Sequence, residues 1–185
     1  MRLWTIHPLA VWDVIQQEGC YHCDPELAID GKDWPDSYDW MSRQMRIRVG
    51  PPPDGVRWPV WAWEKKPDLR SWLGRNNKEP YVRLTLEIPG SAVLLSEFQD
   101  WHFVLWGGYL ALTEAEADAN ENATFAERES SWERIFDLEG IRDAWQGGGG
   151  REERHVQATL WEIRREQVQH CEIFKPHKLS TGAQV

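Results

Sequence analysis

The sequence feature that most constrains the fold is a tryptophan-rich segment at residues 59–70, PVWAWEKKPDLR. Val60 and Ala62 alternate with Trp61 and Trp63, so a strand here buries side chains on both faces, as the central strand of a sheet does. The strand ends in charge, and the proline that follows does not continue a hydrogen-bonded ladder. The pattern therefore predicts a buried strand that delivers charged residues to one rim of a sheet: Glu64, Lys65, Lys66 and Arg70.

The aromatic composition leaves two interpretations open. The chain has thirteen tryptophans against five phenylalanines and four tyrosines. A large ring with one N–H donor is usually buried in a core or at its rim, with that donor satisfied. The alternative is a ring-lined cleft that stacks a base or a nicotinamide-like ring.

The charge and the cysteine content limit the class of protein. The net charge is −9, from 30 acidic and 21 basic residues, so the field of the whole molecule opposes a nucleic-acid backbone or an anionic membrane. We find no window of 18 apolar residues and expect no secretory leader. Three cysteines, an odd number, favour a reducing compartment. We expect a soluble, cytoplasmic protein without a membrane partner.

Local patterns predict alternating helices and strands. Residues 3–6 are typical of a short strand, and the helix that Pro8 opens ends at Gly19. Strict alternation over residues 81–88 predicts a half-buried strand. Further predictions are a loop at residues 24–36, helices that begin at Ser37 and Ser96, a helix over residues 124–137, and two strands within residues 155–174 that form a hairpin or lie side by side.

Together these elements predict the fold class. Strands at the start, middle and end of the chain, with helices between them, favour an α+β domain built around a largely antiparallel sheet. A length of 185 residues suffices for a full core. We expect a single domain over residues 1–175 and a C-terminal tail over residues 176–185.

The soft metal ligands of the chain lie in two groups. Cys20, His22 and Cys23 form one, and His170 with Cys171 the other. The C-x-H-C spacing is not that of a zinc knuckle, and adjacent residues of a strand point to opposite faces. We interpret these residues as core or surface positions and assign no metal. The same spacing argues against a cysteine–histidine nucleophile pair.

Four segments resemble a small, uncharacterised bacterial family of domains of unknown function: LWTIHP, GPPPDGVRWPVWAW, LEIPGSAVLLSEFQDWH and QATLWEI. The opening strand LWTIH, the helix that ends in QQEGCY, the central strand and the closing VQATLWEI also resemble, in their order, the toxin-type ADP-ribosyltransferases. That resemblance implies a split, strongly bent sheet that grips NAD. It also implies a carboxylate near the ribosyl centre and a ring-lined slot for the leaving nicotinamide.

The resemblance assigns roles to individual positions. It places Thr5 and His7 against the adenosine ribose, and Trp61 and Trp63 against the nicotinamide. Arg70 joins this cofactor-binding set from the rim. Where the family carries a closing-strand glutamate, this chain has Thr159, so catalysis would fall to Gln157 and another acid such as Glu64 or Asp100; the catalytic assignments are Gln157 and Glu64.

The implied function is the NAD-dependent transfer of ADP-ribose to an unknown macromolecular acceptor. An alternative is a catalytically inactive module that binds a nucleotide or a protein partner through the same tryptophan-lined cleft, an alternative favoured by the missing glutamate. A third possibility is an interaction protein that uses exposed tryptophans.

Overall fold

The computed structural model describes residues 1–26, 28–70, 79–140 and 151–175. The predicted tail at residues 176–185 lies outside these ranges. In chain order the helices and strands are β1 (Arg2–Pro8), α1 (Leu9–Glu18), β2 (Cys20–His22), α2 (Ile29–Asp33), α3 (Pro35–Arg48), β3 (Val60–Trp63), β4 (Tyr81–Glu87), η1 (Gly90–Ala92), β5 (Leu94–Glu97), α4 (Phe98–Leu105), α5 (Glu114–Ala119), α6 (Phe125–Ser131), η2 (Trp132–Phe136), η4 (Arg151–Glu153), β6 (Val156–Leu160), β7 (Glu162–Arg164), η5 (Arg165–Gln167) and β8 (Val168–Phe174).

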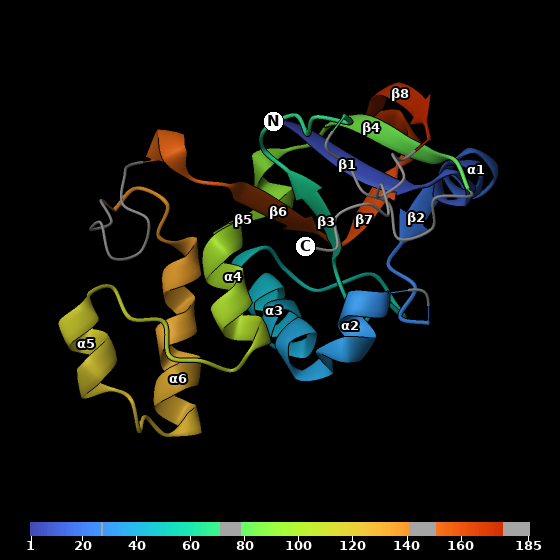
Figure 1. Ribbon diagram of the computed structural model, residues 1–185. Coiled ribbons are helices and arrows are strands. Elements are labelled where there is room, and N and C mark those ends of the chain that lie inside the picture. Colours follow the sequence, from blue (N-terminus) through green and yellow to red (C-terminus); the bar gives the residue numbers. More distant parts are fainter. Residues whose placement is uncertain (27, 71–78, 141–150, 176–185) are drawn as a thin grey trace, which may run out of the picture.

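The main sheet is antiparallel and has six strands in the order β5-β6-β3-β1-β4-β8 (Figure 1). This confirms the prediction of a mixed α and β fold around a largely antiparallel sheet. The segment at residues 60–63 is an interior strand, as its two-sided alternation predicts. The alternating segment at residues 81–87 is β4, also interior. A separate two-stranded sheet joins β2 to β7.

The six strands form two halves that meet at a narrow seam. β1 pairs with β4 through seven residues, but with β3 only through Trp4 opposite Trp63. Next to that pair, the Thr5 hydroxyl donates a hydrogen bond to the Trp61 carbonyl oxygen at 2.7 Å. A side chain thus bridges the two strands beside their single backbone register pair.

The two faces of the sheet bury different kinds of side chain. The face carrying Leu3, Val60, Ala62, Leu84 and Ala158, here called the aliphatic face, packs against α1 and Ile163 of β7. The opposite face carries Trp4, Trp61, Trp63 and Gln157 and is called the tryptophan face. The helices α3 and α4 and the turn η2 pack against it (Figure 1).

Helix boundaries follow local chemistry, with two corrections to the prediction. Gly19 ends α1 in the left-handed conformation, with φ of 82°. Ser37 is not a cap, because α3 begins earlier at Pro35, whose missing N–H costs nothing in the first turn; the Ser37 hydroxyl donates to the Val104 carbonyl oxygen instead. Ser96 lies in β5, and the carboxylate of Glu97 caps α4.

Other regions also differ from the prediction or extend it. Residues 24–36 contain α2 and the start of α3 rather than only loop. The predicted helix over residues 124–137 is α6 followed by the 3-10 turn η2, and Thr124 and Glu127 form a capping box at its start. No helix among the described residues is long and apolar enough to cross a membrane.

The predicted hairpin or side-by-side pair at the C-terminal end is wrong. β6 pairs with β3 and β5, β7 pairs with β2, and β8 pairs with β4 in the other half of the sheet. β6 is buried along its whole length, so it needs a neighbour on each side. β8 is partly exposed and lies at the sheet edge.

Candidate functional site

The structure brings three of the predicted site residues together on the tryptophan face. In the ladder between β3 and β6, Trp61 is opposite Thr159 and Trp63 is opposite Gln157. On the other side of β6, Gln157 is opposite Ser96 of β5. Residues directly opposite each other in a ladder point to the same face, so these side chains form one continuous strip.

Aromatic contacts hold the two tryptophans of this strip differently. The Trp61 ring lies 4.9 Å from the Trp101 ring and 5.8 Å from that of Tyr38, so it is part of the packing between the sheet and the helices. Trp63 contacts Phe98 edge-on, with the ring centroids 4.9 Å apart. Trp63 therefore stands at the border of the helical layer and is the better placed of the two to contact a ligand.

Three polar atoms of the strip are buried without a hydrogen-bond partner: the Gln157 amide nitrogen, the Ser96 hydroxyl and the Trp61 indole nitrogen. Gln157 is 4% exposed and Ser96 fully buried. A buried donor without an acceptor is costly, and each such group in a native structure calls for an explanation. Two N–H donors and one hydroxyl are left over for a ligand or an ordered water.

Thr5 and His7 lie on the other face of the sheet. Thr5 shares the aliphatic face with Leu84, its partner on β4. Its hydroxyl already donates to Trp61, so it accepts from the His7 Nε2 at 2.9 Å, which fixes the proton of a neutral His7 on that nitrogen. The structure does not bring Thr5 and His7 together with Trp63 and Gln157, because strand alternation separates them.

His7 is neutral at ordinary pH. Its ring packs edge-on against Tyr21, 5.5 Å away. Burial lowers the pKa of His7 to about 4, because the imidazolium form loses its hydration there. His7 thus offers no positive charge to an anionic ligand near pH 7.

The rim residues both have ionic partners. Glu64, directly after β3, pairs with Arg151 of η4. Arg70 pairs with Asp68, two residues before it in the chain, and the Arg70 side chain is 88% exposed. The first pair lies at the end of β3, where the Glu64 backbone N–H donates to the Val156 carbonyl oxygen of β6. Arg70 lies out in solvent.

Thr159, the position on the closing strand at which the sequence resemblance predicted a glutamate, is closed off from solvent. It is fully buried. Its hydroxyl contacts the Met45 sulfur at 3.2 Å and the Leu94 carbonyl oxygen at 3.3 Å. This position faces α3, so it contributes packing and not a ligand contact.

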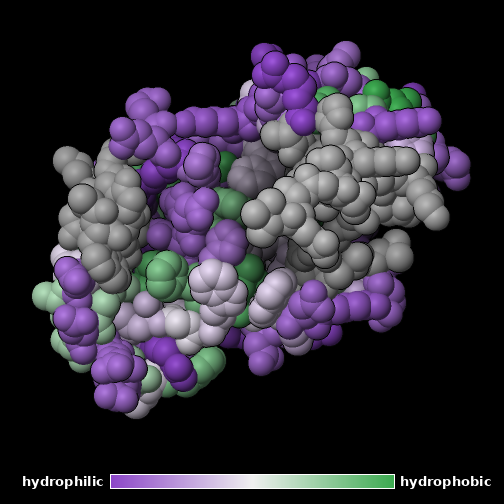
Figure 2. Space-filling view, in the orientation of Figure 1, coloured by the Kyte–Doolittle hydropathy of each residue, from purple (hydrophilic) through white to green (hydrophobic). Residues whose placement is uncertain are grey.

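A surface hollow that the sequence did not indicate lies beside this helical layer. It has a volume of about 470 Å³ and is lined by the start of α3, the end of α4 and α6. Trp106 is 70% exposed and Phe125 57% exposed at its edge. In Figure 2 the surface over the helices is mixed, with small separate hydrophobic areas between hydrophilic residues. Trp106 follows α4 and Phe125 begins α6, so only their spatial proximity reveals this surface.

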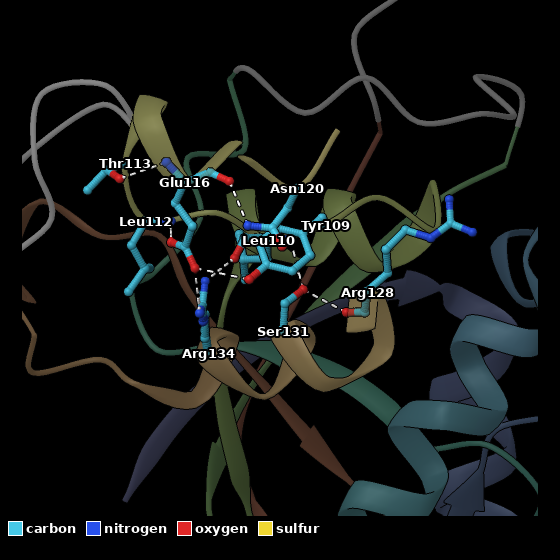
Figure 3. A network of polar contacts seen from close by, with 9 residues as sticks. All are labelled: Tyr109, Leu110, Leu112, Thr113, Glu116, Asn120, Arg128, Ser131 and Arg134. Carbon is cyan, nitrogen blue, oxygen red and sulfur yellow. Dashed lines mark hydrogen bonds and ion pairs between the residues drawn. The ribbon is translucent and has the colours of Figure 1, made fainter. Parts of the chain in front are cut away.

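The acidic segment after α4 is tied down by a polar network (Figure 3). Glu116 of α5 accepts hydrogen bonds from the Tyr109 hydroxyl at 3.0 Å and the Leu112 backbone at 2.8 Å, and pairs with Arg134 at 2.7 Å. The Arg134 guanidinium is the main reason that the pKa of Glu116 is lowered. This network joins α5 to η2, and its groups are matched to one another.

Comparison with known proteins identifies the family. The family model described as Domain of unknown function (DUF3841) matches residues 2–128. The chain belongs to this family. The matched region runs from β1 to α6 and so includes Trp61 and Trp63, whereas β6 with Gln157 lies beyond it. No curated protein and no solved structure matches the chain.

Proposed function

We propose that this member of the family is an ADP-ribosyltransferase-like protein that binds NAD and transfers ADP-ribose to a macromolecular acceptor. The observation that carries the proposal is the arrangement of three strands. The opening strand β1, the tryptophan-bearing β3 and the closing β6 are neighbours, and β1 separates from β3 after one register pair. A split sheet, with the opening and central strands at the seam and the closing strand beside them, fits the resemblance to this enzyme family.

The tryptophan face supplies suitable groups for NAD. Trp63 offers an aromatic surface for the nicotinamide, and the Gln157 amide offers a donor for a ribose hydroxyl or the carboxamide oxygen. Glu64, at the end of β3, is the carboxylate that we assign to the ribosyl centre once it leaves Arg151.

In the proposed transfer, the bond between the anomeric carbon and the nicotinamide nitrogen breaks. The electron pair of that bond stays on nicotinamide, which leaves as the neutral molecule. The acceptor forms the new bond to the anomeric carbon and loses a proton. A carboxylate beside the carbon stabilises the positive charge that develops during this exchange.

One observation favours a second function, which is binding without transfer. Thr159, at the position where the proposed resemblance would put a glutamate, is buried under α3. A protein that keeps the ring-lined face but lacks this carboxylate would bind a nucleotide and leave it intact.

A single experiment separates these functions. The melting temperature of the purified chain is measured with and without a millimolar excess of NAD, and nicotinamide release is followed in the same samples. A stabilisation with release, both lost in Gln157→Ala and kept in the exposed control Gln16→Ala, supports the transferase. Stabilisation without release supports the binding module, and neither effect refutes both proposals in favour of an interaction protein.

A further inference from the structure

Away from the tryptophan face, three residues with different metal-binding atoms lie together on the sheet formed by β2 and β7. They are Cys20, His22 and Glu162. A thiol sulfur, an imidazole nitrogen and a carboxylate oxygen from these residues all lie within 4.8 Å of one another. The His22 Nε2 is 3.2 Å from the Glu162 Oε2. All three residues are partly exposed, so an ion can reach them from solvent.

Backbone structure, not a loop, positions these side chains. In the two-stranded sheet Cys20 is opposite Arg164, Tyr21 opposite Ile163 and His22 opposite Glu162. Ile163 is fully buried in the aliphatic core and Tyr21 packs against the same core. Strand alternation therefore directs Cys20, His22 and Glu162 to the outer side of the sheet.

The turn before β2 fixes the start of this pair of strands. Gly19 ends α1 with a positive φ, and its carbonyl oxygen accepts a hydrogen bond at 2.8 Å from the Arg165 backbone nitrogen, just beyond β7. The strands are thus held together at the end where Cys20 lies. Residues about 140 positions apart in the chain meet in a defined register.

We propose that Cys20, His22 and Glu162 bind one zinc-type divalent cation. A thiolate, an imidazole and a carboxylate are the ligand types of zinc, whereas calcium and magnesium require oxygen ligands alone. The thiolate and the carboxylate neutralise the two charges of the ion. Three protein ligands leave the fourth tetrahedral position to water.

Arg164 contacts the same carboxylate from beside the site. Its guanidinium contacts the Glu162 Oε1, while His22 contacts the other oxygen. The Arg164 side chain is 55% exposed, so it can move into water when a cation takes its place beside the carboxylate. Arg164 therefore competes with the metal, and Arg164→Gln should bind it more tightly than the natural chain does.

Cobalt(II) is the probe for this site, because a cobalt–thiolate bond gives a charge-transfer absorption band. The full chain is freed of metal with a chelator and titrated with Co²⁺, and Zn²⁺ is then added to displace it. We expect one Co²⁺ per chain with a thiolate band, and an increase in melting temperature with either ion, because the native state alone presents the assembled ligands.

Variants assign the ligands. Cys20→Ser should abolish the band. His22→Asn and Glu162→Gln should weaken metal binding by about tenfold or more, since mutation of a residue that only orients a metal ligand commonly lowers metal affinity by that factor. The controls are Cys23→Ser, next to the site, and Cys171→Ser on β8, whose thiol is also free and partly buried. Far-UV circular dichroism verifies that each variant is folded.

The outcomes that overturn the proposal are equally specific. The absence of a thiolate band at one equivalent of Co²⁺ refutes the site. So does a band that persists in folded Cys20→Ser, or one that Cys171→Ser removes as completely as Cys20→Ser. Tighter binding by Arg164→Gln supports the proposed competition, and unchanged binding contradicts that part of the account.

Discussion

The two faces of the main sheet use the same strands for opposite purposes. On the aliphatic face Val60, Leu84 and Ala158 are almost fully buried against α1 and Ile163, and the polar Thr5 has its hydroxyl fully engaged. On the tryptophan face large rings pack against α3 and α4, yet donors of Gln157, Ser96 and Trp61 have no partner. A face that only stabilises a fold satisfies its polar atoms, whereas a face that leaves several unsatisfied is the better place to expect a ligand.

The largest expected effect is on the aliphatic face. Leu84→Ala removes a fully buried side chain and leaves a cavity, so the free energy of unfolding should fall by about 3 kcal/mol. Urea denaturation measures this loss. If the two faces have separate roles, the folded Leu84→Ala variant should bind NAD with the same affinity as the natural chain. A weaker affinity would show that the aliphatic face also contributes to binding.

The single histidine of the aliphatic face should make the protein acid-sensitive. Burial lowers the pKa of His7 from 6.5 to about 4, so between these values the unfolded chain binds a proton that the folded chain does not. The free energy of unfolding should therefore fall as pH drops from 6.5 towards 4, by at most about 3 kcal/mol for this group, since one pKa unit corresponds to about 1.4 kcal/mol. Denaturation over that range should show a flatter dependence in His7→Asn; an equal dependence in both proteins would show that His7 is not the cause.

A substitution on the tryptophan face should separate stability from function. Gln157→Leu replaces a buried amide that has an unpartnered nitrogen with an apolar side chain of similar size, so the protein should be as stable or more stable by about 1 kcal/mol. Stabilisation by NAD should be lost. Thermal unfolding with and without NAD measures both quantities, and a clearly destabilised variant would mean that the Gln157 amide is part of the packing.

The network around Glu116 provides a reference outside both faces. Its donors and acceptors are matched, but its side chains are only partly buried (Figure 3). Glu116→Gln weakens the pair with Arg134 and should lower the free energy of unfolding by about 0.5 kcal/mol. Chemical denaturation in low and high salt tests this, since the difference from the natural chain should shrink when salt screens the pair.

The local part of the fold could be predicted from the sequence. The interleaved apolar and tryptophan residues predict that β3 is an interior strand, and the alternation of apolar and polar residues predicts that β4 is a strand. Gly19 marks the end of α1. The pairing of the last three strands could not be predicted, because each finds its partner far away in the chain. A hairpin between β6 and β8 is the local solution, and burial on both sides of β6 overrides it.

The candidate site was predictable only in part, for the same reason. Trp61 and Trp63 share a parity with each other, and Gln157 joins them through the register of β6. Thr5 and His7 fall on the other face because Trp4, not Thr5, is opposite Trp63. The meeting of Glu162 with Cys20 and His22 depends on the distant pairing of β2 with β7, which no spacing in the sequence reports.

Titration of NAD into the chain, followed by intrinsic tryptophan fluorescence, tests the central claim most directly. The natural chain should show saturable quenching, and Trp63→Ala should bind NAD about tenfold or more weakly, since stacking on one aromatic ring contributes roughly 1–3 kcal/mol. Trp106→Ala, which removes a tryptophan that is 70% exposed beside the separate surface hollow, should bind as the natural chain does. An absence of saturable quenching, or equal affinities in the Trp63→Ala and Trp106→Ala variants, would contradict NAD binding at the tryptophan face.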